Sequence, residues 1–191
     1  MLAQGDRAGA IALLQQAIGQ EPNNHALHAE LADLLVMDNR VDEARQILAG
    51  LPEDTEGIDK ARNRIWFLDE AESLPPVETF GEEAEVGTDP GKRIDLAIRL
   101  VSEDRIEEAL EHLLTAMKQD ERCDEERARK TMIRVFDLLG KGNELATQYR
   151  RKMFTFLALN VIAELHPVIL NFHLVILNVV KDLPWGYFAS R

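Results

Sequence analysis

The segment Asn39-Arg40-Val41-Asp42-Glu43-Ala44 recurs almost residue for residue as Asp104-Arg105-Ile106-Glu107-Glu108-Ala109. Each copy opens with a residue suited to a chain reversal and carries an alanine small enough to let a neighbouring helix approach closely. Each copy runs on into apolar residues three and four positions apart, the spacing of one helical face. The recurrence predicts a repeated helix–turn–helix unit.

A further copy begins at Gly5 and sets the period of the repeat. Ala10 and Ala44 are 34 residues apart, and Leu14 and Leu48 share that separation. This is the period of the tetratricopeptide repeat, which the sequence resembles. The resemblance implies an all-α fold, a superhelix of stacked antiparallel helical hairpins.

The predicted helices follow from the apolar spacing, from Pro22 and Pro52 as stops, and from the Gly140–Asn143 turn. They cover residues 6–20, 24–38, 41–50, 56–73, 91–102, 105–119, 124–140 and 143–165. Paired prolines, glycines and clustered acids mark a linker between them. We expect N-terminal repeat-like helices, an acidic linker, C-terminal repeat-like helices and an apolar tail, over residues 1–73, 74–90, 91–157 and 158–191.

The N-terminal repeat lacks nearly all of its first helix, because only residues 1–4 precede the turn. A solenoid needs a cap at each end, since each repeat leaves an apolar face for its neighbour. The start is therefore expected to be cut from a longer protein. A dimer, or a short start covered by the tail, is the alternative.

Composition excludes several classes of protein. The 191 residues carry a formal charge of −12 and are 46% hydrophobic, which argues against nucleic-acid binding and against disorder. One cysteine excludes an internal disulfide, and no signal peptide is visible. We expect a soluble cytoplasmic protein.

Charge is unevenly distributed along the chain. Residues 127–152 hold eight basic and two acidic residues, whereas residues 53–89 hold twelve acidic and three basic ones. This polarity could steer a partner of matching charge. Two solvated faces that attract each other within the superhelix are an equal alternative.

No catalytic or metal-binding constellation can be assembled from the sequence. His25 and His28 share a helical face, but zinc needs a third ligand that does not follow at a natural spacing. Cys123 has no partner histidine nearby in the sequence. We therefore expect no enzyme, no cofactor and no metal.

Trp66 has two interpretations. It shares a helical stripe with apolar residues, Ala61, Ile65 and Leu68, which favours core packing. In the alternative, Trp66 lines a concave groove and grips an apolar segment of a client protein.

The segments Ala128–Gly140 and Gly142–Met153 are similar to the C-terminal end of bacterial thioredoxin–tetratricopeptide proteins, the chaperedoxins or YbbN family. That resemblance implies a holdase co-chaperone that protects unfolded clients and passes them to the chaperonin, with the helix from Glu144 to about Leu157 implicated in docking. The thioredoxin part is missing, so no redox role carries over. The predicted protein-binding residues are Trp66, Arg129, Lys130, Arg134, Tyr149, Arg150, Arg151 and Lys152.

The tail does not fit the repeat pattern. It contains Val168-Ile169-Leu170-Asn171 and, seven residues later, Val175-Ile176-Leu177-Asn178, and its apolar run is too short to span a membrane. One hypothesis is a non-functional tail that resembles translated intergenic repeat DNA after a frame change. The other is a capping helix over the open end of the solenoid.

The sequence favours a non-catalytic protein-binding repeat module whose partners are unfolded clients and the chaperonin. A generic repeat scaffold in a multiprotein assembly is the alternative, and tail-mediated membrane association is a third, less expected one. Homodimerisation through the solenoid end or the tail stays open.

Overall fold

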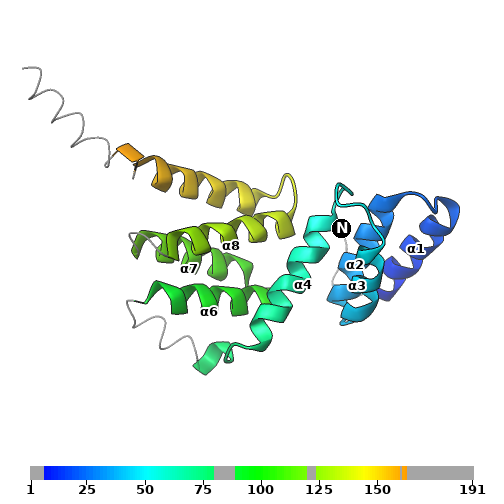
Figure 1. The fold of residues 1–191 in the computed structure, drawn as a ribbon, viewed down its shortest axis with the longest axis horizontal. Coiled ribbons are helices and arrows are strands. Elements are labelled where there is room, and N and C mark those ends of the chain that lie inside the picture. Colours follow the sequence, from blue (N-terminus) through cyan, green and yellow to red (C-terminus); the bar gives the residue numbers. More distant parts are fainter. Residues whose placement is uncertain (1–6, 80–88, 120–123, 160, 163–191) are drawn as a thin grey trace, which may run out of the picture. The chain divides into compact units, whose positions relative to one another are not determined.

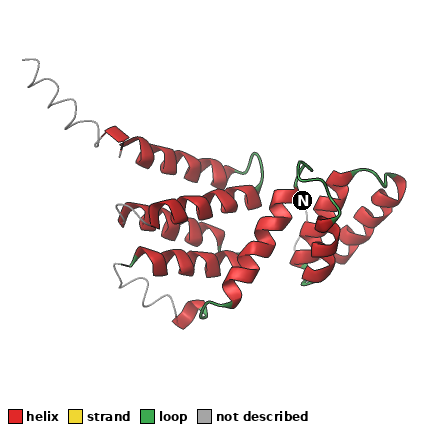
Figure 2. Cartoon of the chain, viewed as in Figure 1, coloured by secondary structure: helices red, strands yellow, loops and turns green. Residues whose placement is uncertain are grey.

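The computed structural model describes residues 7–79, 89–119, 124–159 and 161–162, and within these residues the secondary structure is entirely helical (Figure 2). The chain divides into two compact units, residues 1–149 and residues 150–191. The prediction of an all-α fold built from helical hairpins is confirmed.

The helices lie within two residues of their predicted positions wherever they are described. They are α1 (Arg7–Gln20), α2 (His25–Met37), α3 (Val41–Ala49), α4 (Ile58–Glu72), α6 (Pro90–Ser102), α7 (Ile106–Gln119) and α8 (Asp124–Leu139). Residues 77–79 are helical, and residues 144–159 form a further helix. The N-terminal start, Cys123 and the tail beyond residue 162 lie outside the described residues.

The repeated sequence motif produces the same turn twice. Asn39 and Asp104 both adopt positive φ angles, 63° and 64°. The next residue closes each turn, because Arg40 N–H donates to Leu35 O and Arg105 N–H to Leu100 O, both at 2.9 Å. This is the hydrogen-bond pattern of a Schellman motif, which ends one helix and reverses the chain into the next.

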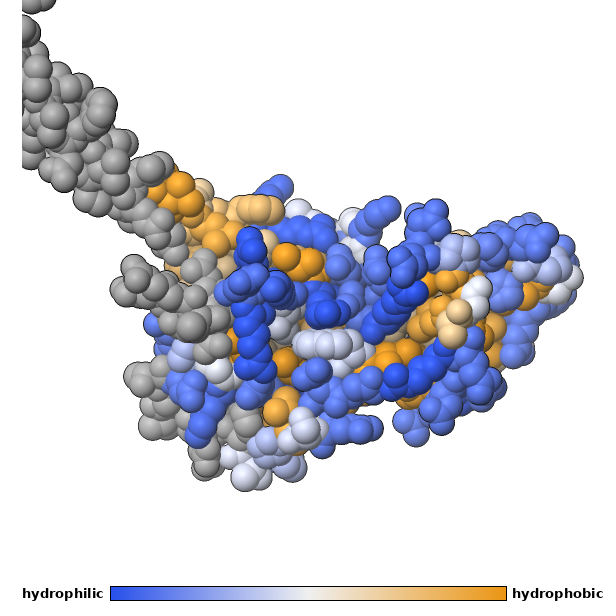
Figure 3. Space-filling model, in the orientation of Figure 1, coloured by the Kyte–Doolittle hydropathy of each residue, from blue (hydrophilic) through white to orange (hydrophobic). Residues whose placement is uncertain are grey.

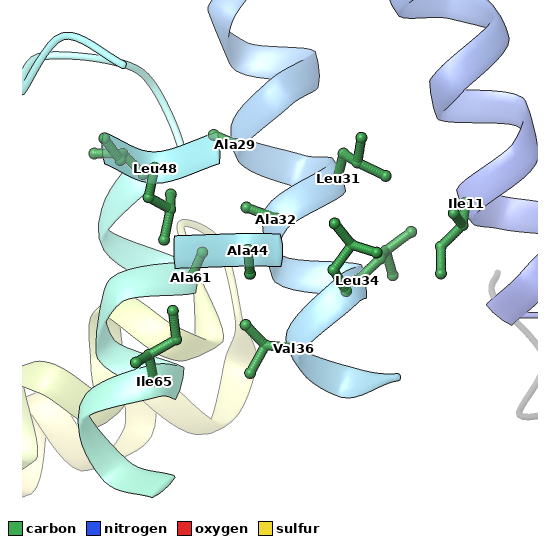
Figure 4. Packing of buried hydrophobic residues seen from close by; sticks show 12 residues of the cluster. Ile11, Ala29, Leu31, Ala32, Leu34, Val36, Ala44, Leu48, Ala61 and Ile65 are labelled. Carbon is green, nitrogen blue, oxygen red and sulfur yellow. The ribbon is translucent and has the colours of Figure 1, made fainter. Parts of the chain in front are cut away.

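Small residues let the helices of the first unit pack closely. Ala29, Ala32, Ala44 and Ala61 are fully buried where α2, α3 and α4 meet (Figure 4). With no side chain beyond Cβ, they bring the backbones together, and larger residues such as Leu48 and Ile65 fill the remaining space.

Helix α4 joins the two sets of hairpins. It packs against α2 and α3 on one side and against α6 and α8 on the other (Figure 1). The helices before and after residues 74–90 therefore belong to one compact unit.

A buried ion cluster fixes α2 on α4. The carboxylate of Asp33 is 1% exposed and lies 2.8 Å from Lys60 Nζ and 2.8 Å from Arg64 Nε. Both cations come from α4, one turn apart, so a single carboxylate of α2 meets two positive charges of its neighbour.

None of the helices in the described residues has the length and the apolar composition of a membrane-spanning helix.

Candidate functional site

An open groove of about 750 Å³ lies between α4, α6 and α8. Its lining mixes aromatic, aliphatic and charged side chains from three helices that are far apart in the sequence. The lining residues are Asp59, Asn63, Trp66, Glu70, Ile98, Glu126, Arg127, Lys130, Thr131, Ile133, Arg134 and Asp137.

One wall is a stripe along α4. Asp59, Asn63, Trp66 and Glu70 follow one another at intervals of four, three and four residues, so they share one face of the helix. The opposite face of α4 carries buried residues such as Ala61 and Ile65. Helix α4 therefore contributes to the core with one face and to the groove with the other.

The other wall is a stripe along α8. Arg127, Lys130 and Arg134 recur at intervals of three and four residues and place three cations along the groove. Ile133 adds an apolar side chain that is 43% exposed.

Arg134 spans the groove. Its guanidinium lies over the indole of Trp66, with the guanidinium carbon 4.4 Å from the ring centroid. Its Nη1 also donates a 2.8 Å hydrogen bond to Asn63 Oδ1. A cation over an aromatic face is attracted by the ring quadrupole, so α4 and α8 are linked by two interactions of one side chain.

The other two cations of the groove have carboxylate partners. Arg127 pairs with Asp95 of α6, and Lys130 Nζ lies 2.7 Å from Glu126 Oε1. The hydrogen bond from Lys130 lowers the pKa of the Glu126 carboxyl below its usual value. The groove therefore carries charges of both signs rather than one basic surface.

The structure brings together three of the predicted binding residues and separates the others. Trp66, Lys130 and Arg134 line the groove. Arg129 is exposed on α8 outside the groove lining, and Arg151 is exposed in residues 150–191. Arg150 and Lys152 are half-buried in that second unit.

Tyr149 is buried, so its predicted place in a binding surface requires correction. Its hydroxyl donates to Glu111 Oε1 of α7. Burial, together with that carboxylate, raises the pKa of the Tyr149 phenol. The side chain holds the last helix to α7 instead of facing a partner.

The position of Trp66 lies between its two interpretations from the sequence. Trp66 is half-buried and lines the groove, whereas the adjacent Phe67 is fully buried. The two rings meet edge to face, with centroids 4.9 Å apart. The groove alternative for Trp66 is the one that the geometry favours.

Sequence reasoning missed the polar residues around Trp66. Asp59, Asn63 and Glu70 lie on the same face of α4 as Trp66, and the helical spacing around the tryptophan was the available signal. Ile98 and Ile133 come from α6 and α8, and no local pattern indicated that these helices would face α4.

In the described part of the chain, no group of three histidine, cysteine or carboxylate side chains is placed to hold a metal ion. His28 Nε2 instead bonds to Pro22 O at 3.0 Å.

Comparison with known families covers most of the chain. Two family models, each described as tetratricopeptide repeat, match residues 1–62 and residues 70–157. A search of curated proteins finds no match. Repeats of this kind are in general non-catalytic modules for protein–protein interaction.

Proposed function

The chain is a tetratricopeptide-repeat protein, and from that premise we propose that the groove between α4, α6 and α8 holds a segment of another polypeptide. The observation that carries this proposal is the half-buried Trp66 on the groove wall, with Arg134 laid across it. Trp and Arg are the side chains that most often dominate the energy of protein interfaces.

The lining offers contacts for both the side chains and the backbone of an unfolded segment. Trp66, Ile98 and Ile133 offer apolar contacts, while Arg134 offers N–H donors and Asp59 offers a carboxylate. An extended polypeptide presents apolar side chains and unpaired backbone groups at the same time, so a mixed lining can satisfy both. A groove of about 750 Å³ has room for several side chains.

The finer proposal is a co-chaperone role in the cytoplasm. It rests on the similarity of residues 128–153 to the closing segment of the chaperedoxins, whose partners are unfolded clients and the chaperonin. The module would act without a catalytic step, by keeping a client segment covered in the groove. Recovery of the chaperonin in a pulldown from cytoplasmic extract is the expected result, and recovery of a defined assembly without chaperonin favours the scaffold alternative.

Suppression of aggregation tests the groove itself. A chemically denatured reporter enzyme is diluted into buffer with the full chain, and aggregation is followed by light scattering. Trp66→Ala and Arg134→Glu are expected to lower the apparent affinity for the reporter by about tenfold or more, the loss typical of a dominant interface residue.

The matched control is Arg129→Glu, which reverses the same charge on the same helix outside the groove. It is expected to suppress aggregation like the unchanged chain. Circular dichroism checks that each variant keeps its helices. Equal loss in Arg129→Glu and Arg134→Glu, or full activity in both groove variants, contradicts the proposal.

A further inference from the structure

The exposed large apolar side chains of the described residues are concentrated near the end of the last helix. Four of the six lie within residues 154–162: Phe154, Leu159, Val161 and Ile162. Phe154 is 62% exposed and Leu159 is 60% exposed. Figure 3 shows apolar surface at this end of the described chain.

The last residues of this helix are mostly apolar, and much of their surface is exposed. Met153 is buried, while Phe154, Ala158 and Leu159 are exposed, and Val161 and Ile162 are exposed as well. From Met153 to Ile162 the sequence has no charged residue. Exposed apolar side chains gathered at one end of a helix mark a surface that can contact a partner or lipid.

The sequence is basic directly before this surface and mostly apolar after it. Arg150, Arg151 and Lys152 precede it directly, in a chain whose formal charge is −12. The residues that follow keep the apolar composition, because Glu164 is the one charged residue between positions 153 and 180. Trp185 and Tyr187 then follow Lys181, and these residue types are enriched at membrane–water interfaces.

We propose that residues 150–159, together with Val161 and Ile162, bind the surface of an anionic lipid bilayer. Phe154, Leu159 and Ile162 enter the boundary between headgroups and acyl chains, and the exposed Arg151 faces the negatively charged headgroups. The contact is interfacial, consistent with the absence of a spanning helix among the described residues. This inference is independent of the groove and of its polypeptide ligand.

Charge complementarity favours lipid over a second copy of the chain. Residues 153–162 carry no charged side chain that could form ion pairs with a second copy of this helix. The exposed guanidinium of Arg151 beside this apolar surface matches a headgroup layer that is both anionic and laterally fluid.

Flotation with vesicles tests the proposal on the full chain. Vesicles of phosphatidylcholine with phosphatidylglycerol are compared with vesicles of phosphatidylcholine alone. The chain is expected to float mainly with the anionic vesicles. F154D/L159D is expected to lower that binding by about tenfold or more, because two large apolar side chains lose their contact with lipid.

Two further variants test the contribution of charge and the specificity of the apolar surface. Arg151→Gln is expected to weaken binding to the anionic vesicles by about fivefold, the effect of one basic residue near such a surface, with no change for phosphatidylcholine alone. Leu13→Asp is the matched control, since Leu13 is 69% exposed on α1, and it is expected to bind as the unchanged chain does.

The proposal is overturned if the full chain floats with neither kind of vesicle, or if F154D/L159D and Leu13→Asp float equally well. It is also overturned if the chain without lipid is a stable dimer that F154D/L159D dissociates and that vesicles do not bind. In that case a second copy covers this surface. Circular dichroism confirms the helical content of each variant.

Discussion

At the scale of single residues, the two turn positions Asn39 and Asp104 show how strongly a short motif determines local structure. A positive φ angle is costly for most side chains and is tolerated by asparagine and aspartate. Both positions were predicted as turn residues from sequence, and both adopt nearly the same φ angle. The two turns were therefore predictable from the residue types at positions 39 and 104.

The turn geometry leads to a prediction for Asn39. Asn39→Gly is expected to change the free energy of unfolding by less than about 1 kcal/mol, because glycine accepts the positive φ angle without strain. Asn39→Val is expected to destabilise the protein by about 1–2 kcal/mol, since a β-branched side chain is strained there. Urea unfolding followed by circular dichroism measures both, and equal stability of the two variants would refute the interpretation.

Tyr149 leads to a prediction about pH. The folded state raises the pKa of the phenol above its ordinary value of 10.0, so folding favours the protonated form. Its contribution to stability is complete below about pH 10 and is lost as the pH rises above that value. The unchanged chain should therefore lose more stability than Tyr149→Phe between neutral and alkaline pH.

Urea unfolding of both proteins over a pH series checks this prediction. At neutral pH, Tyr149→Phe is expected to be less stable by about 1 kcal/mol, because the hydrogen bond to Glu111 is lost. Parallel pH profiles for the two proteins would show that the phenol does not titrate differently in the folded state.

At the scale of elements, the buried ion cluster between α2 and α4 was not predictable from the sequence. Asp33 lies in an apolar helix, and a local pattern does not say which residues of a distant helix approach it. Lys60 and Arg64 are 27 and 31 positions further along the chain. Long-range partners of this kind follow from packing, whereas helix positions follow from local spacing.

Asp33→Ala is expected to destabilise the protein by about 1–3 kcal/mol, because the charged hydrogen bonds from Lys60 and Arg64 to this carboxylate are lost, while both cations keep partial access to water. The control is Glu30→Ala, which removes a nearby carboxylate that is exposed and 3.8 Å from Lys60 Nζ. That change is expected to cost less than about 1 kcal/mol. Chemical denaturation measures both, and equal costs would contradict a structural role for the buried cluster.

The same division between local and long-range information explains the groove. Helical spacing could place Trp66 on a stripe of α4, but it could not show whether the stripe faced the core or solvent. Arg134 is 71 residues from Asn63, and their hydrogen bond depends on how α8 packs on α4. The helical hairpins could therefore be predicted from the sequence. That the stripes on α4 and α8 face each other across the groove could not.

At the scale of the first compact unit, the hairpins stack so that each covers the apolar face of the next and leaves a groove lined by three helices. Small alanines at repeated positions allow the stacking, and the helix faces left over supply the lining. The proposed binding of a polypeptide depends on this groove, which is open and is lined by apolar and charged side chains.

Site-specific photo-crosslinking tests most directly whether that groove holds a polypeptide. A photoreactive amino acid is placed at Ile133, a partly exposed residue of the groove lining, or at Leu13, a more exposed residue of α1 outside it. Each full-length variant is illuminated with a denatured client, and the crosslinked products are quantified. Crosslinks from position 133 well above those from position 13 are the predicted result, and equal yields, or crosslinks from position 13 alone, would contradict the account.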